Sequence, residues 1–195
     1  MFLARDDLYV YRGVNPNQLF KQMSELTISF AGCQNCNIEA RLARGSIATH
    51  PTHGTAIVTC FHGPVDRRNH CHCTPPPNLV SDNGTVLQLI EPIQPRDVAW
   101  LGMPNIAGAP RQISVNNPTV GEQVTVILPG RRLTVNVRAV VGRDDPLTGT
   151  LELDLDAAFA EGDSGSPVLN AQDRVIAIVR NTQGRCGFIL ERRRP

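Results

Sequence analysis

The feature that most constrains the fold is a long succession of short β-like runs separated by turn residues. Several runs alternate between apolar and polar residues, as in 133–139 (LTVNVRA) and 151–155 (LELDL), which is typical of half-buried antiparallel strands. About a dozen strands with no helix between them predict an all-β sandwich or barrel. Two turn-rich segments, His62–Asn83 and Gly142–Gly149, are expected to be loops. The expected strands are Leu26–Phe30, Ile38–Arg44, Ser46–His50, Thr55–Phe61, Thr85–Ile90, Val98–Leu101, Arg111–Val115, Gln123–Leu128, Leu133–Val141, Thr150–Leu155, Pro167–Leu169, Val175–Arg180 and Gly187–Leu190.

A connecting stretch divides these strands into two groups. Met103–Thr119 is rich in proline, glycine and asparagine, so we place a boundary near residue 104. The predicted units are 26–103 and 104–195, each with about six strands. Residues 1–25 form an N-terminal segment with a short helix, which Asn15 can cap.

Composition excludes several broad classes of protein. The chain has 195 residues, of which 41% are hydrophobic and 19% are charged, and this balance excludes wholesale disorder. A formal net charge of +1 gives no bulk attraction for polyanions, so we expect no nucleic-acid partner. No apolar run approaches the roughly 18 residues of a membrane span, and we expect no transmembrane segment. Met1–Asp7 lacks the apolar core of a signal peptide.

The segment 161–167 (EGDSGSP) contains a candidate nucleophile. Gly162 and Gly165 let the chain bend tightly around Ser164, which exposes the hydroxyl group. Such a turn can aim the backbone N–H groups of Gly162 and Ser164 at one point, where they would form an oxyanion hole. An Asp-Ser-Gly triplet alone would be an ordinary β-turn. The complete motif, followed by the apolar residues Val168 and Leu169, favours a nucleophilic serine.

This motif resembles the nucleophile motif of chymotrypsin-like serine proteases. The resemblance implies two six-stranded antiparallel β-barrels with the site between them, and a His and an Asp that precede the Ser. A serine needs an imidazole to take its proton near neutral pH. Of the five histidines, His62 alone follows a long β-rich apolar run, 55–61 (TAIVTCF), and enters a small turn as the family's catalytic His does. Phe61 stands where the family usually has Ala.

The third member of such a triad is a carboxylate that orients the imidazole. Asp97 precedes the apolar run 98–101 (VAWL), similar to the family's Asp. Asp66 and Asp82 also lie between His62 and Ser164 in the sequence, but in polar loops. Their residue types favour turn formation, and Asp82-Asn83-Gly84 is typical of a hairpin. The predicted catalytic residues are therefore His62, Asp97 and Ser164, with no organic cofactor.

Short loops and local motifs resemble the viral branch of this family. The segment 164–179 is similar to the end of alphavirus capsid proteases, and 28–63 is similar in layout to the proteases of hepatitis C-like viruses. Arterivirus proteases are a further option. These resemblances imply cleavage of a polyprotein, sometimes in cis, in the host cell cytoplasm, with membrane association through partners. The hepatitis C-like group also implies a small viral protein cofactor that completes the first barrel.

The family resemblance also places the substrate pocket. Its base falls on Ala158, with Phe159 beside it, and the absence of Asp there argues against a Lys or Arg preference. Val179 and Phe188 would complete a modest apolar pocket for a small or medium uncharged side chain. Arg180 gives two alternatives: a preference for acidic residues near the scissile bond, or a solvated charge at the end of a strand.

Two compact clusters of cysteine and histidine indicate a metal site. Cys33-x-x-Cys36 and Cys71-x-Cys73 can provide four thiolates for a tetrahedral structural zinc, with His70 or His72 as substitutes. The zinc site of hepatitis C-like proteases lies in the second half and cannot be transferred, because no Cys occurs between residues 73 and 186. Disulfides and free thiols are the alternatives; a cytosolic setting disfavours disulfides.

Two rival functions come from other classes of protein. The protease fold can serve as a coat or binding module after one self-cleavage in cis, which the alphavirus-like segment suggests. The Cys/His clusters can also stabilise an RNA-binding module through zinc. Multiple turnovers on a separate peptide would distinguish a protease from a spent coat protein. The order His, Asp, Ser argues against the RNA-binding module.

Overall fold

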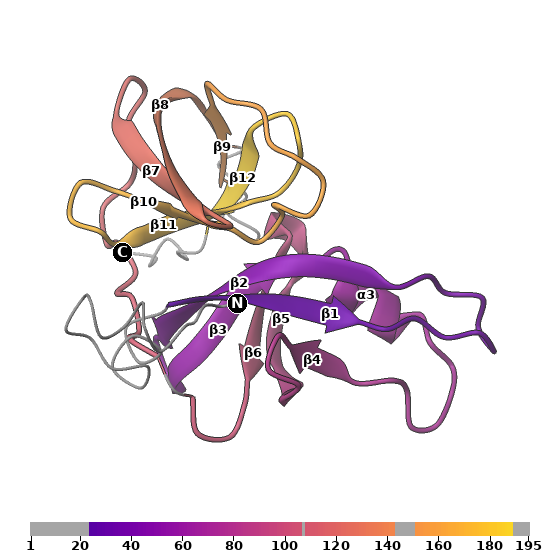
Figure 1. Cartoon of the computed structure of the whole chain (residues 1–195). Helices are drawn as coiled ribbons and strands as arrows, with labels where there is room; N and C mark the ends of the chain where they lie inside the picture. Colours follow the sequence, from indigo (N-terminus) through magenta and orange to yellow (C-terminus); the bar gives the residue numbers. More distant parts are fainter. Residues whose placement is uncertain (1–23, 107, 143–150, 189–195) are drawn as a thin grey trace, which may run out of the picture.

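A computed structural model describes residues 24–106, 108–142 and 151–188 of the chain. Within these ranges, twelve antiparallel strands form two closed barrels of six strands each (Figure 1). This confirms the predicted all-β fold with two six-stranded barrels. The helix predicted after Asn15 and nearly all of the segment 1–25 lie outside the described residues.

The first barrel has the strand order β1-β2-β3-β6-β5-β4. A short helix, α3, follows β3, and a 3₁₀ turn, η1, precedes β6. Its elements are β1 (Glu25–Phe30), β2 (Arg41–His50), β3 (Gly54–Cys60), α3 (Pro64–Asn69), β4 (Leu79–Ser81), β5 (Val86–Ile93), η1 (Gln94–Arg96) and β6 (Val98–Gly102).

The second barrel has the order β10-β11-β12-β9-β8-β7. In Figure 1 it lies above the first barrel, and the strands run from salmon to yellow. Among the described residues, neither helix has the length and apolarity that a membrane crossing requires. The strands are β7 (Gln123–Leu128), β8 (Arg131–Gly142), β9 (Leu151–Leu155), β10 (Pro167–Leu169), β11 (Val175–Val179) and β12 (Arg185–Phe188).

Two strands predicted in the first half are a single strand. Ile38–Arg44 and Ser46–His50 were expected to be separate, but β2 runs through Gly45 without a turn. A Cβ atom at Gly45 would lie 2.8 Å from Ile28 Cδ1 and 2.9 Å from Ile57 Cγ2. The glycine therefore makes room for core side chains of the barrel, and it does not break the strand.

The prediction of a loop over His62–Asn83 is wrong in two places, because α3 and β4 lie within it. Pro64 suits the first turn of α3, and the strand β4 is only three residues long. Conversely, the predicted strand Arg111–Val115 is absent from the barrels and makes only isolated parallel bridges. Each barrel still has six strands. In the first barrel, β4 replaces the strand that was lost when two predicted strands merged into β2. In the second, the loss of Arg111–Val115 reduces the seven predicted strands to six.

Three clusters of buried apolar side chains hold the molecule together. One fills the first barrel and another fills the second. The third lies between them and joins Trp100 and Val58 of the first barrel to Leu169 and Ile178 of the second. Such shared burial of apolar area stabilises the two barrels against each other. The barrels therefore meet through a hydrophobic interface at whose edge the candidate site lies.

Candidate active site

His62 lies in a turn between β3 and α3. Phe61 N–H donates to the carbonyl of Asp97 at 2.9 Å, and Asp66 N–H donates to the carbonyl of Phe61 at 3.0 Å. Gly63 has a φ of 92°, a left-handed conformation that favours glycine and allows α3 to start at once. The turn leaves the His62 side chain 45% exposed, so its ring contacts the protein on one side and is open to solvent on the other.

Asp97 joins η1 to β6. Its φ of 57° is in the left-handed region, which Asp tolerates better than most residues, and its N–H donates to the carbonyl of Gln94 at 2.9 Å. The carboxylate is nearly buried and lies against His62. Asp97 Oδ2 is 2.5 Å from His62 Nδ1, and Asp97 Oδ1 accepts the backbone N–H of His62 at 2.8 Å. Two contacts from one carboxylate fix both the turn and the imidazole.

Ser164 belongs to a turn of the second barrel. Asp163 orders this turn, because its Oδ2 accepts the N–H of Ala160 at 2.9 Å and its carbonyl accepts the N–H of Ser166 at 3.0 Å. The Ser164 hydroxyl lies 3.2 Å from His62 Nε2. When Nδ1 carries the ring proton toward Asp97, Nε2 can accept the hydroxyl proton, for which the Arg180 carbonyl oxygen at 3.3 Å is the alternative acceptor. The chain Ser164–His62–Asp97 is thus continuous across the two barrels.

The other two aspartates considered from the sequence lie elsewhere. Asp82 Oδ2 accepts the N–H of Thr27 at 3.3 Å in the hairpin between β4 and β5. Asp66 is in α3 and pairs with His70 at 3.3 Å. Of the three candidates, the structure brings only Asp97 into contact with His62.

Beside the Ser164 hydroxyl, the backbone N–H groups of Gly162 and Ser164 have no acceptor among the described residues. Gly162 has a φ of 94°. Unpaired donors beside a nucleophile can stabilise an oxyanion that develops there.

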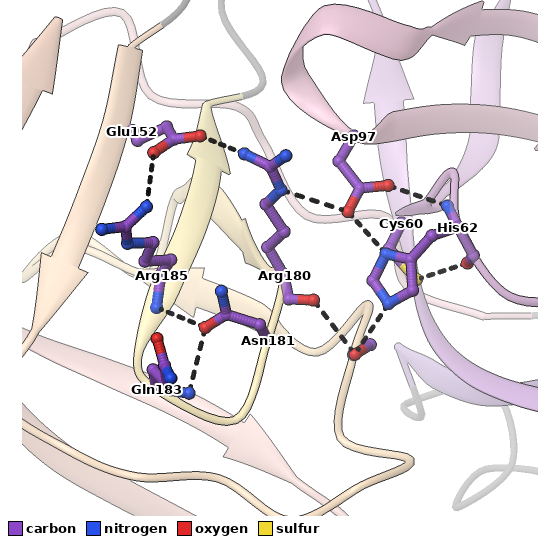
Figure 2. Close-up of polar contacts among 9 residues, drawn as sticks. Cys60, His62, Asp97, Glu152, Arg180, Asn181, Gln183 and Arg185 are labelled. Carbon is purple, nitrogen blue, oxygen red and sulfur yellow. Dashed lines mark hydrogen bonds and ion pairs between the residues drawn. The ribbon is translucent and has the colours of Figure 1, made fainter.

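Arg180 forms a network with the site that the sequence did not reveal. Its guanidinium is 3.4 Å from Asp97 Oδ2 and forms an ion pair with Glu152, and its carbonyl oxygen lies 3.3 Å from the Ser164 hydroxyl. Figure 2 shows Arg180 between Asp97 and Glu152, with Arg185 at the other carboxylate oxygen of Glu152. Arg180 is therefore not a solvated strand-end charge.

The predicted substrate-binding residues have different surroundings. Phe159 and Val179 are buried in the core of the second barrel, whereas Ala158 is exposed. Phe188 ends β12, and its side chain lies outside what the structure describes. A pocket lined by these residues remains a prediction.

The four cysteines predicted as ligands lie together at one end of the first barrel. Their Sγ atoms are all within 4.8 Å of one another. The N–H of His72 donates to Cys36 Sγ at 3.2 Å and is the main cause that lowers the pKa of this thiol to about 7. Contacts with Cys33 and Cys36 raise the pKa of the Cys73 thiol to about 12. The group is a candidate metal site.

Cys60 and Cys186 are separate from this group and buried. Burial raises the pKa of both thiols, and the negative charges of Asp97 and Asp154 raise them further. Both therefore stay protonated near neutral pH. Cys60 is close to His62 in sequence but has the character of a small core residue.

Comparison with known proteins gives fold relatives only. No family model and no curated protein matches the chain. The Rv3671c protease from M. tuberculosis, in its active form, is 17% identical and covers 90% of this chain and 80% of its own, with a TM-score of 0.62. Deg5 is also 17% identical, over 89% of this chain and 87% of its own, with a TM-score of 0.63. These likenesses show the double-barrel fold.

Proposed function

We propose that the protein is a chymotrypsin-like serine endopeptidase. The observation that carries this proposal is the continuous chain from the Ser164 hydroxyl through His62 to Asp97, beside the free amides of Gly162 and Ser164. The fold likeness to the Rv3671c protease supports it. In this proposal the unit 26–103 carries His62 and Asp97, and 104–195 carries Ser164.

The proposed reaction has two stages. Ser164 Oγ attacks the scissile carbonyl carbon while its proton passes to His62 Nε2, and the Asp97 carboxylate stabilises the resulting imidazolium. The amides of Gly162 and Ser164 hold the tetrahedral oxyanion. The C–N bond then breaks, and the amine leaves with the proton from His62. Water attacks the acyl-enzyme with His62 again as base, which releases the acid and regenerates Ser164.

We further infer that the substrate is a viral polyprotein with a small or medium uncharged residue at the scissile bond. Asp97 and Glu152 together already balance the charge of Arg180, which leaves it little attraction for an acidic side chain. The resemblance of segments 28–63 and 164–179 to hepatitis C-like and alphavirus proteases is the basis for proposing a viral source, host cytoplasm and a small viral protein cofactor.

A peptide library that varies the residue before the scissile bond tests this function. The full chain is expected to cleave peptides in trans with many turnovers, with a preference for uncharged residues at that position. A strong preference for Lys or Arg would contradict the proposed pocket. A single burst of less than about one product per enzyme would instead support the coat-module alternative.

A further inference from the structure

Two segments far apart in the sequence bring four sulfur atoms together. Cys33 and Cys36 lie at the tip of the β1–β2 hairpin, where Cys33 and Ile38 exchange two backbone hydrogen bonds of 2.8 and 2.9 Å. Cys71 and Cys73 follow α3, and the Cys71 N–H donates to the carbonyl of Arg68 at 3.1 Å. Both pairs are therefore held by ordered backbone.

The spacing of the sulfur atoms fits a tetrahedral metal centre. Zinc–sulfur bonds of about 2.3 Å in a tetrahedron place neighbouring sulfur atoms about 3.8 Å apart. The Sγ atoms of Cys33 and Cys73 are 3.5 Å apart, those of Cys36 and Cys71 are 3.5 Å apart, and those of Cys36 and Cys73 are 3.8 Å apart. Two disulfides would give each sulfur one partner, whereas Cys36 lies near two.

The groups around the sulfur atoms suit an anionic cluster. Besides the His72 N–H on Cys36, the amide of Asn35 donates to Cys73 Sγ at 3.9 Å. Such N–H donors stabilise thiolates bound to a metal.

We propose that Cys33, Cys36, Cys71 and Cys73 bind one zinc ion that braces the turn carrying His62. Four sulfur ligands leave no open position for water, so the role of the ion is structural. Metal binding does not depend on the proposed protease function, whereas the effect on His62 does.

The brace acts through the end of the first barrel. Cys33 and Cys71 pack against the core cluster that contains Phe61 and Val65, the residues on either side of the His62 turn. Phe61 also contributes the carbonyl that accepts the Asp66 N–H at the start of α3. The zinc would link the end of α3 to the β1–β2 hairpin. This link would limit movement of α3 and of the His62 turn from which α3 starts.

Metal analysis of the full chain, purified without added metal, tests the site. We expect about one zinc per chain in the wild type and less than about a tenth of that in Cys36→Ser and Cys71→Ser. Cys186→Ala and His72→Ala are matched controls, which should keep the full amount. Less than about half an equivalent in the wild type, or loss of zinc from His72→Ala, would overturn the Cys₄ site.

Two further readouts separate the site from the catalytic proposal. Cobalt(II) in place of zinc should give the intense visible absorption of a tetrahedral thiolate site. Removing zinc with a chelator should lower the melting temperature by at least about 5 °C and slow fluorophosphonate labelling at least about tenfold, both restored by zinc. If the protein binds zinc but its removal changes neither the melting temperature nor the labelling rate, the proposed stabilisation of the His62 turn by zinc is wrong. Absent labelling with zinc bound would contradict the protease instead.

Discussion

Asp97 has the most demanding role of any single residue in the site. Its two oxygens meet the imidazole and backbone N–H of His62, and Oδ2 also faces the guanidinium of Arg180. An acceptor is required toward both His62 groups, so an amide at this position must turn an N–H toward one of them. The carboxylate thus sets which nitrogen of His62 carries the proton.

Asp97→Asn is therefore expected to lower kcat by about 10⁴-fold while changing KM little, because the imidazole would hold the wrong tautomer. Steady-state hydrolysis of a peptide substrate measures this. Asp82→Asn is the matched control and should keep full activity, since among the described residues the Asp82 carboxylate accepts a hydrogen bond from Thr27 N–H of β1 and does not contact His62. Similar losses from both substitutions would exclude Asp97 from the proposed role.

These residues also show which parts of the site could be predicted from local sequence. His62, Asp97 and Ser164 were predictable because a nucleophile and its base need particular residue types beside particular turns. The contacts of Arg180 with Asp97 and Glu152 were not, because the first depends on how the two barrels meet and the second on how β12 pairs between β11 and β9. No local pattern encodes that placement.

At the scale of elements, the approach of the Ser164 turn to β2 fixes the site across the two barrels. Arg44 N–H donates to the carbonyl of Ser164 at 2.7 Å, and the Thr59 hydroxyl donates to the carbonyl of Arg44 at 2.6 Å. Gly165 has a φ of 92°, and a Cβ there would lie 1.8 Å from the Arg44 carbonyl oxygen. The Arg44 carbonyl belongs to the backbone of β2, so it cannot move away from an added Cβ as the end of a flexible side chain could.

Gly165→Ala should accordingly destabilise the fold by about 3 kcal/mol or more, since it adds a steric clash to an unfavourable φ. Gly121→Ala isolates the second effect: Gly121 has a φ of 86°, but among the described residues other than its chain neighbours no atom lies within 4 Å of the added Cβ. Its cost should be about 1 kcal/mol. Urea unfolding measures the free energy of unfolding of both variants. Equal decreases would mean that the Arg44 carbonyl does not clash with a side chain at position 165.

Some helices and strands could not be predicted from local sequence patterns. Turn residues in 62–83 concealed α3 and β4, because Pro64 can begin a helix as well as a turn and a three-residue strand has no detectable alternation. Gly45 suggested a strand end, yet its role is set by Ile28 and Ile57 in neighbouring strands. Packing across the barrel decides such positions.

At the scale of the whole molecule, the barrels share an apolar interface. Trp100 is 2% exposed and packs in the cluster that contains Leu169 and Ile178 of the second barrel. It is the single tryptophan of the chain, so its fluorescence reports on this interface. Separation of the barrels would expose this cluster to water, at a cost that favours joint unfolding.

We therefore expect the urea transition followed by Trp100 fluorescence to coincide with the transition followed by far-UV circular dichroism, which reports on both barrels. Coincident midpoints and slopes are the expected outcome. A fluorescence change that precedes the loss of strand signal would show that the barrels separate before they unfold.

The central claim is that Ser164 is a nucleophile activated by His62. It is tested most directly by a fluorophosphonate probe, which reacts with activated serines, applied to the full-length wild type and to Ser164→Ala. Ser164 Oγ lies 3.2 Å from His62 Nε2, so the wild type should be labelled at one site, which peptide mapping places at Ser164. Ser164→Ala should not be labelled. Labelling that survives this substitution, or a folded wild type that resists the probe, would contradict the claim.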